Sequence, residues 1–210
     1  MIRILIADDH PLIREGFKKI LRGEPDLTIV HEAQTALEAL QFAADEQVDI
    51  VLLDIGMPDR SGLEVLREIK MHRPKLPVLM LSMYPEDRFA VRAIRSGAAG
   101  YITKESASED LVGAIRKILA GGRYISPALA EKLASDLQTP SAKTPHEALS
   151  DREFQILCLI ASGMTVSQIA GKLILSVKTI STYRSRILEK MNMKTNAELT
   201  HYAISNKLVD

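Results

Sequence analysis

A short apolar run that ends on a carboxylate constrains this chain more than any other stretch. Residues Ile50 to Leu53 are consecutive apolar residues, and Asp54 and a proline-containing turn follow them directly. A run of this length that is bounded by a turn is typical of a central parallel strand, buried on both faces. Asp54 is therefore expected at the carboxyl end of that strand, where burying a charge is costly unless other groups stabilise it.

Three further apolar runs end on polar residues in the same way. They cover residues 2–7, 78–81 and 99–103, and they lead into Asp8 and Asp9, into Ser82 and into Lys104, respectively. Amphipathic stretches long enough for crossover helices lie between the runs, at residues 11–21, 37–44, 63–72, 87–95 and 108–119. Alternating strands and helices predict a parallel sheet, in which ligands bind outside the carboxyl ends of the strands.

The polar residues that end these strands are expected to converge at one edge of the sheet. They comprise three carboxylates, one hydroxyl and one ammonium group. Oxygen ligands suit a hard cation such as Mg²⁺, and a lysine acts as a point charge toward a phosphate group. The sequence therefore predicts a site for a divalent metal ion and a phosphoryl group.

This constellation resembles the receiver domain of two-component response regulators, over residues 1 to about 120. The matching positions are Asp8, Asp9, Asp54, Met57, Pro58, Gly62, Ser82, Tyr101 and Lys104. The resemblance implies an α/β fold with a doubly wound five-stranded parallel sheet of the flavodoxin-like kind. It also implies that Asp54 is the phosphoacceptor, which attacks the phosphohistidine of a sensor histidine kinase.

The resemblance further implies roles for the residues around Asp54. Asp8 or Asp9, together with Asp54 and the backbone carbonyl of Gly56, would hold Mg²⁺. Lys104 and the hydroxyl of Ser82 would bind the phosphoryl oxygens, and the ring of Tyr101 would move inward after Ser82.

Two serines in the receiver-like part of the chain are expected to cap helices. Many receivers carry Asp or Asn at the position of Ser61, but Ser61 and Glu64 match a capping box. Ser106 and Glu109 predict a second capping box, at the start of the helix that Gly121 and Gly122 end.

Charge and composition divide the chain into two parts. Residues 1–148 hold 19 basic and 22 acidic side chains, whereas residues 149–210 hold 8 and 5, so the shorter part is expected to meet a polyanion. Between the parts, Ser126 caps a predicted helix that starts at Pro127 and reaches about Leu137. Residues 138–145, with two prolines, are typical of a tether. The expected domains are a receiver at 1–122, a linker helix and tether at 123–148, and a smaller C-terminal domain at 149–210.

Start signals predict a smaller all-α domain of four helices after residue 149. Capping boxes are expected at Ser150 with Glu153, at Thr165 with Gln168 and at Thr195 with Glu198, and Ser176 is expected to cap the third helix. The second helix, at about 166–173, and the third, at about 177–191, form a predicted helix-turn-helix whose third helix is the recognition helix. The single Cys158 lies in an apolar helical run and is expected to be a buried structural thiol.

The periodicity of the third helix separates a buried stripe from an outer face. The stripe comprises Val177, Ile180, Ile187, Leu188 and Met191, and the opposite face comprises Lys178, Thr182, Ser185, Arg186 and Lys190. That face could enter a major groove, and a merely solvated face is the alternative. Arg184 falls within the stripe, and we hypothesise that it pairs with Glu153 or another acid of the first helix.

Residues 149–210 resemble the LuxR-type helix-turn-helix, and the whole chain resembles the NarL/FixJ class of response regulators. The matching segments are Leu149-Ser150-x-Arg152-Glu153, Ile169-Ala170-x-x-Leu173 and residues 176–180. By position, the resemblance implies groove contacts from Lys178, Ser181, Thr182 and Ser185, and backbone contacts from Thr179, Arg186 and Lys190. It implies double-stranded promoter DNA as the ligand and a homodimer on phosphorylation, with RNA polymerase as a further candidate partner.

The leading interpretation is a phosphorylation-activated, DNA-binding transcription regulator that is not an enzyme. One alternative is a phosphatase with Asp54 as its nucleophile, although Gly56 stands where a second carboxylate would be needed. Another is a relay whose C-terminal domain binds a protein, and such binding would lack the steep salt dependence of phosphate contacts. No apolar run is long enough to span a bilayer and no signal sequence precedes the first strand, so a cytoplasmic protein without a membrane partner is expected.

Overall fold

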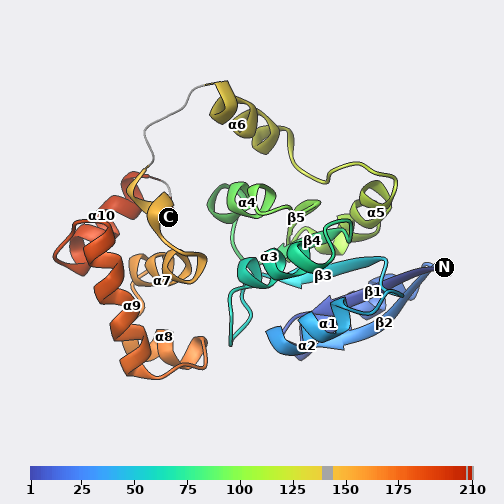
Figure 1. The fold of residues 1–210 in the computed structure, drawn as a ribbon, viewed down its shortest axis with the longest axis horizontal. Helices are drawn as coiled ribbons and strands as arrows, with labels where there is room; N and C mark the ends of the chain where they lie inside the picture. The colour runs from blue at the N-terminus through green and yellow to red at the C-terminus, as the bar shows by residue number, and fades with distance from the viewer. Residues whose placement is uncertain (139–143, 207, 210) are drawn as a thin grey trace. The chain divides into compact units, whose positions relative to one another are not determined.

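The computed structural model describes residues 1–138, 144–206, 208 and 209 of the chain. These residues form two compact units, Met1–Ala130 (the first unit) and Glu131–Asp210 (the second unit) (Figure 1). Residues 139–143 of the predicted tether lie outside the described residues. Among the helices that are described, none combines the length and the apolar character that crossing a membrane requires.

The first unit is a five-stranded parallel sheet with the strand order β2-β1-β3-β4-β5, which confirms the predicted fold class. Its strands are β1 (Ile2–Ala7), β2 (Leu27–Ala33), β3 (Ile50–Asp54), β4 (Val78–Ser82) and β5 (Gly100–Thr103). The helices between and after them are α1 (Pro11–Leu21), α2 (Ala36–Ala43), α3 (Gly62–His72), α4 (Glu86–Arg95) and α5 (Ala107–Leu119). The sequence pattern does not reveal β2, because this edge strand is fully buried only at its two ends.

Strand β3 lies at the centre of the sheet, and all five of its residues are buried. On one face, Ile4, Ile6 and Leu52 pack with Phe17 of α1 and Leu111 of α5. The near-continuous apolar sequence of β3 follows from this position, since a central parallel strand is covered on both faces. Its carboxyl end, where Asp54 lies, is therefore fixed by the packing of the whole core.

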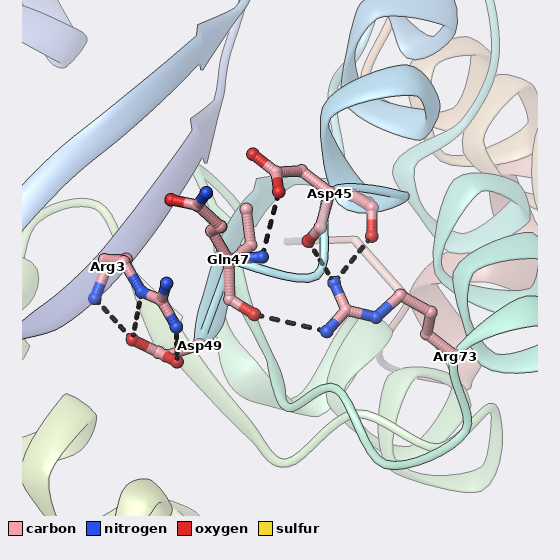
Figure 2. Close-up of polar contacts among 7 residues, drawn as sticks. Arg3, Asp45, Gln47, Asp49 and Arg73 are labelled. Carbon is pink, nitrogen blue, oxygen red and sulfur yellow. Dashed lines mark hydrogen bonds and ion pairs between the residues drawn. The ribbon is translucent and has the colours of Figure 1, made fainter.

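Arginine side chains hold the loop that leads into β3. Figure 2 shows the guanidinium of Arg73, just after α3, pointing into the loop between α2 and β3. It donates hydrogen bonds to the carbonyls of Ala43 (3.0 Å), Asp45 (2.5 Å) and Val48 (3.4 Å). In the same figure, Arg3 of β1 pairs with Asp49, with 3.0 Å between Nη2 and Oδ1. These contacts fix the start of β3, and a strand with a fixed start delivers its last residue to a fixed place.

Both capping boxes predicted in the first unit are wrong. Ser61 does cap α3, but its hydroxyl accepts from the amide of Leu63 (3.4 Å), not from that of Glu64. Ser106 makes no side-chain cap, and its hydroxyl lies 2.8 Å from that of Thr103. The backbone of Ser106 already has helical angles (φ −76°, ψ −16°), whereas a capping residue needs an extended conformation.

The segment after α5 runs beside the edge strand β5. The amide of Tyr101 donates to the carbonyl of Tyr124 (3.0 Å), and the amide of Tyr124 donates to the carbonyl of Ala99 (3.0 Å). A Cβ at Gly100 would lie 2.8 Å from the Tyr124 oxygen, so glycine permits this close approach. Helix α6 (Pro127–Gln138) follows, and the hydroxyl of Ser126 accepts from the amide of Leu129 (3.1 Å), which confirms the predicted cap.

The second unit is helical and contains the four predicted helices. They are α7 (Asp151–Ala161), α8 (Val166–Lys172), α9 (Val177–Lys190) and α10 (Asn196–Ser205), and a short 3₁₀ helix, η1 (Pro145–Ala148), precedes them. The capping boxes at the starts of α7 and α8 are formed, and Ser176 caps α9. At α10, Thr195 accepts from the amide of Glu198, but the Glu198 carboxylate accepts from Lys194 instead of completing a box. Cys158 is buried, as predicted.

Ile174, in the turn between α8 and α9, has a left-handed backbone conformation. Its φ is +50°, a conformation that strains the backbone of a β-branched residue. Its side chain is 74% exposed, so burial of apolar surface offsets little of this strain. Asn192, which follows α9, has a φ of +53°, and asparagine tolerates this region better than isoleucine. We expect Ile174→Asn to raise the free energy of unfolding by about 1 kcal/mol in urea denaturation. Asn192→Ile should lower it, and a less stable Ile174→Asn variant would contradict the assignment of strain.

Candidate functional site

Three charged side chains meet at the carboxyl edge of the sheet. Asp8 follows β1, Asp54 ends β3, and Lys104 follows β5. The Lys104 ammonium lies 2.7 Å from Asp8 Oδ2 and 2.9 Å from Asp54 Oδ2, and its side chain is 3% exposed. Asp8 and Asp54 are buried as well, so the ammonium compensates two carboxylates that water hardly reaches. The strand ends thus bring these residues together as the sequence indicated.

The acidic side of this cluster is consistent with a metal site. Asp8, Asp9, His10 and Asp54 each offer one ligand atom, and these atoms all lie within 4.8 Å of one another. Carboxylate oxygens are ligands that hard divalent cations prefer. His10 had no place in the predicted site, and its Nδ1 lies 2.8 Å from Asp9 Oδ1. The His10 ring is 60% exposed. Arg14 is buried, and its guanidinium donates a hydrogen bond to the backbone carbonyl of Asp8 (2.7 Å).

Burial dominates the electrostatics of Asp54. Loss of solvent raises the pKa of its carboxyl to about 6, although the charge of Lys104 opposes this, and the charge of Asp8 raises the pKa further. The amide of Gly56 also donates to the carboxylate and lowers the pKa. Burial lowers the pKa of Lys104, but the charges of Asp54 and Asp8 outweigh it, so the pKa of Lys104 is raised. Asp54 is therefore a carboxylate that the fold holds at a cost in stability.

This cost predicts the pH dependence of stability without metal. Because the folded pKa of about 6 exceeds the ordinary 3.8, the stabilising protonation is complete below about pH 4 and is lost as the pH rises through 6. We expect the free energy of unfolding of Asp54→Asn to be about 3 kcal/mol higher than that of wild type at pH 7 in chelator, and to lack the decline between pH 4 and 6. Asp49→Asn is the matched control, since Arg3 lowers the pKa of Asp49 and that variant should lose stability at pH 7. Parallel pH profiles for wild type and Asp54→Asn would contradict the assignment.

Ser82 and Tyr101 are linked through the backbone of Tyr84. The Ser82 hydroxyl accepts from the Tyr84 amide (2.9 Å), and the Tyr101 hydroxyl donates to the Tyr84 carbonyl (2.9 Å). Both side chains are buried. The sequence pointed to Ser82 and Tyr101 but not to Tyr84, because a main-chain link leaves no signature in residue type.

Helix α9 presents most of its predicted outer face to solvent. Lys178, Ser181, Thr182, Ser185 and Arg186 are exposed, Thr179 is half-buried, and Ile180, Ile187 and Met191 are buried. The prediction for Val177 is wrong, because its side chain is 51% exposed instead of packed on the preceding helices. Val177 is the first residue of α9, one turn before the first buried residue, Ile180.

The hypothesis that Arg184 pairs with Glu153 or another acid of the first helix is wrong. Arg184 Nε donates to Asn196 Oδ1 at the start of α10 (2.5 Å), and Lys190 pairs with Glu153 instead (2.6 Å). Lys190 lies nearly two helical turns beyond Arg184 and reaches the first turn of α7 from there. A phosphate contact from Lys190 would therefore compete with an existing ion pair.

Comparison with known proteins places both units. Residues 4–116 match the response regulator receiver domain, and residues 147–203 match the luxR family of bacterial regulatory proteins. The chain is 40% identical to the response regulator GacA of Pseudomonas protegens, over 100% of this chain and 99% of that protein. It is 36% identical to the response regulator UvrY of Escherichia coli K12, over 99% and 96%. A solved structure of two RcsB dimers bound to two parallel DNAs is 25% identical, covers 97% of this chain and 98% of that chain, and has a TM-score of 0.58.

Proposed function

Since this chain belongs to the two-component response regulators with a LuxR-family DNA-binding domain, we propose that Asp54 is its phosphoacceptor and that phosphorylation promotes dimeric binding to promoter DNA. The family makes it a transcription regulator and not an enzyme. The observation that carries the proposal is the buried Asp54 beside Asp8 and Lys104, at the ends of neighbouring strands. The phosphodonor is the phosphohistidine of a sensor histidine kinase.

Each part of the chain has a separate task in this proposal. Residues 1–122 receive the phosphoryl group, residues 123–148 form the linker helix and tether, and residues 149–210 bind double-stranded DNA. The protein acts in the cytoplasm, as a homodimer once phosphorylated, with RNA polymerase as a candidate further partner.

The charges around Asp54 suit transfer of a phosphoryl group. An Asp54 carboxylate oxygen forms a bond to phosphorus, the N–P bond of the phosphohistidine breaks, and the imidazole nitrogen keeps the electron pair. Asp8, Asp9, Asp54 and the carbonyl of Gly56 would hold Mg²⁺, which neutralises charge on the transferring group. The Lys104 ammonium, 2.9 Å from Asp54 Oδ2, is placed to bind a phosphoryl oxygen once that carboxylate is esterified.

The backbone of Tyr84 supports a route from the phosphoryl group to the surface. When the Ser82 hydroxyl turns to a phosphoryl oxygen, it leaves the amide of Tyr84 that it now accepts from. Because the Tyr101 hydroxyl binds the carbonyl of that same residue, movement of Tyr84 changes the anchor of the Tyr101 ring. Ser82 and Tyr101 therefore have two alternative arrangements, and phosphorylation shifts the equilibrium between them.

Exposure and charge support α9 as the DNA-binding element. In the proposal, Lys178, Ser181, Thr182 and Ser185 contact base edges, and Thr179, Arg186 and Lys190 contact the phosphate backbone, Lys190 by giving up its ion pair with Glu153. RcsB, which shares this chain's architecture along nearly its whole length, is bound to DNA as a dimer in its solved structure. Two copies of α9 in one dimer would read two half-sites.

The test compares DNA binding by wild type and Asp54→Asn, each with and without Mg²⁺ and a small-molecule phosphodonor. DNA selected from random sequence is the probe, and mass spectrometry counts the phosphoryl groups. We expect wild type alone to gain one phosphoryl group, to dimerise and to bind between about 5-fold and 150-fold more tightly. Asp49→Asn, at the opposite edge of the sheet, should respond as wild type does.

Two results would contradict parts of the proposal. Equal DNA binding by wild type and Asp54→Asn, with and without the donor, would remove the phosphorylation switch and leave DNA binding intact. If binding to DNA does not weaken with added salt, the proposed contacts to DNA phosphates are contradicted, since counterion release accompanies such contacts.

A further inference from the structure

The outer face of α9 carries hydroxyl and methyl groups near its start. Val177, Lys178, Ser181, Thr182 and Ser185 are all exposed. With about 3.6 residues per turn, Lys178, Thr182 and Ser185 lie on the side of the helix away from the buried stripe. Ser181 lies at the margin of that side, and Val177 is exposed beside the stripe in the first turn. Among these five side chains, Lys178 alone is charged, and none is an arginine, asparagine or glutamine. The usual bidentate readers of guanine and adenine are thus absent from this part of the face.

Each of the three hydroxyl groups donates its proton to the helix itself. Ser181 donates to the carbonyl of Val177 (2.9 Å), Thr182 to that of Lys178 (3.0 Å), and Ser185 to that of Ser181 (3.1 Å). A hydroxyl has one proton and two lone pairs. The oxygens of these side chains therefore offer lone pairs to a ligand but no proton.

A surface of acceptors fits some base edges and not others. In the major groove, adenine offers an amino group and one acceptor, guanine offers two acceptors, and thymine offers a methyl group beside its acceptor. An acceptor opposite guanine would leave both groups unsatisfied and desolvated. Cytosine also offers an amino group, and each kind of pair presents two acceptors, so the thymine methyl group is the feature that separates adenine·thymine from guanine·cytosine pairs. The exposed Val177 side chain and the Thr182 methyl group favour pairs that contain thymine.

From this geometry, and resting on the proposed DNA-binding function, we infer that the α9 face formed by Val177, Ser181, Thr182 and Ser185 selects adenine·thymine pairs. The hydroxyl oxygens accept hydrogen bonds from the adenine N6 amino group, and the side chains of Val177 and Thr182 contact the thymine methyl group. Lys178 is the charged donor on this stretch, so a guanine read by this face lies opposite Lys178.

The test starts with sites selected by the full chain from random double-stranded DNA, in the presence of Mg²⁺ and a small-molecule phosphodonor. A selected site is then resynthesised with deoxyuridine for one thymidine, which removes the methyl group, or with unsubstituted purine for one adenine, which removes the amino group. We expect adenine·thymine pairs at the centre of each half-site. Each replacement there should weaken binding by wild type about 3-fold to 10-fold.

Two variants of Thr182 separate the contributions of its atoms. Thr182→Ser keeps the hydroxyl and should make binding insensitive to the loss of one thymine methyl group. Thr182→Val keeps a methyl group and should make binding insensitive to the loss of one adenine amino group. Ser162→Ala is the matched control, because Ser162 donates to the carbonyl of Cys158 (2.9 Å) with the same spacing but lies at the end of α7. It should keep both sensitivities.

The variants Ser181→Ala, Thr182→Val and Ser185→Ala identify the base pairs that this face reads, because the base preference changes there. If wild type selects guanine or cytosine at those positions, the inference is overturned, while DNA binding stands. Equal sensitivity of wild type and both Thr182 variants to the replaced bases would also overturn it. Failure to select any DNA, or selected DNA whose binding does not depend on salt, would instead overturn the proposed DNA-binding function.

Discussion

Replacing Gly62 by alanine should lower the free energy of unfolding of the first unit by at least about 3 kcal/mol. A Cβ at this position would lie 1.9 Å from the carbonyl oxygen of Asp54 and 2.9 Å from the Cα of Ile55. Both neighbours are main-chain atoms, and the amide of Gly62 is itself bonded to the carbonyl of Ile55 (3.1 Å). Room for a methyl group thus requires that α3 separate from the end of β3. Urea denaturation, followed by far-UV circular dichroism, would measure the loss.

Gly16 provides the matched control for this substitution. It lies in α1 on an exposed position, and a Cβ there would meet nothing within 4 Å. Because glycine is unfavourable inside a helix, Gly16→Ala should raise the free energy of unfolding by about 0.5–1 kcal/mol. The two glycine-to-alanine changes are therefore expected to act in opposite directions. Similar stability of the two variants would show that α3 can move without cost.

Lys104→Met should destabilise the first unit by about 3–5 kcal/mol at neutral pH, because it leaves two buried carboxylates without their cation. Methionine preserves the length and much of the volume of the side chain, so the change isolates the charge. The ammonium lies within 2.9 Å of both Asp8 and Asp54, and both carboxylates are buried. Thermal unfolding of the metal-free variant would show the loss.

The pH dependence and a double variant separate charge from packing. Without the ammonium, the pKa of Asp54 rises above its value of about 6 in wild type, so the deficit should shrink as the pH falls and protonates the carboxyl. Lys104→Met combined with Asp54→Asn should recover much of the stability, because one of the two unpaired charges is gone. A deficit that stays constant from pH 8 to pH 5 would assign the loss to packing instead.

The charged cluster around Asp54 could be predicted from the sequence because each of its charged residues ends or directly follows a buried strand. Asp8, Asp54 and Lys104 are recognisable where an apolar run stops, and parallel strands bring their carboxyl ends to one edge. The strand β2 escaped this reasoning, since an edge strand with half-exposed residues does not form a continuous apolar run. The cap at Ser106 failed because the local motif does not specify the backbone angles.

Contacts between helices were harder to predict than strand ends. The period of α9 identified Ile180 and Ile187 as buried but placed Val177 with them, although Val177, the first residue of the helix, is 51% exposed. Whether Arg184 or Lys190 reaches Glu153 depends on where α7 and α10 cross α9, and no pattern within one helix contains that information. The hydroxyl protons of α9 are fixed by rotamers, which residue type alone leaves open.

The pairing of Tyr124 with β5 has a consequence for where the first unit ends as a folding unit. An edge strand with unpaired main-chain groups is a template for association with other chains. The segment around Tyr124 occupies the free edge of β5, with one hydrogen bond from Tyr101 and one to Ala99. A fragment cut at residue 122 would retain every strand and helix of the sheet but would expose this edge to intermolecular pairing. The segment that follows α5 at the end of the first unit is thus also the cover that keeps its sheet from adding further strands.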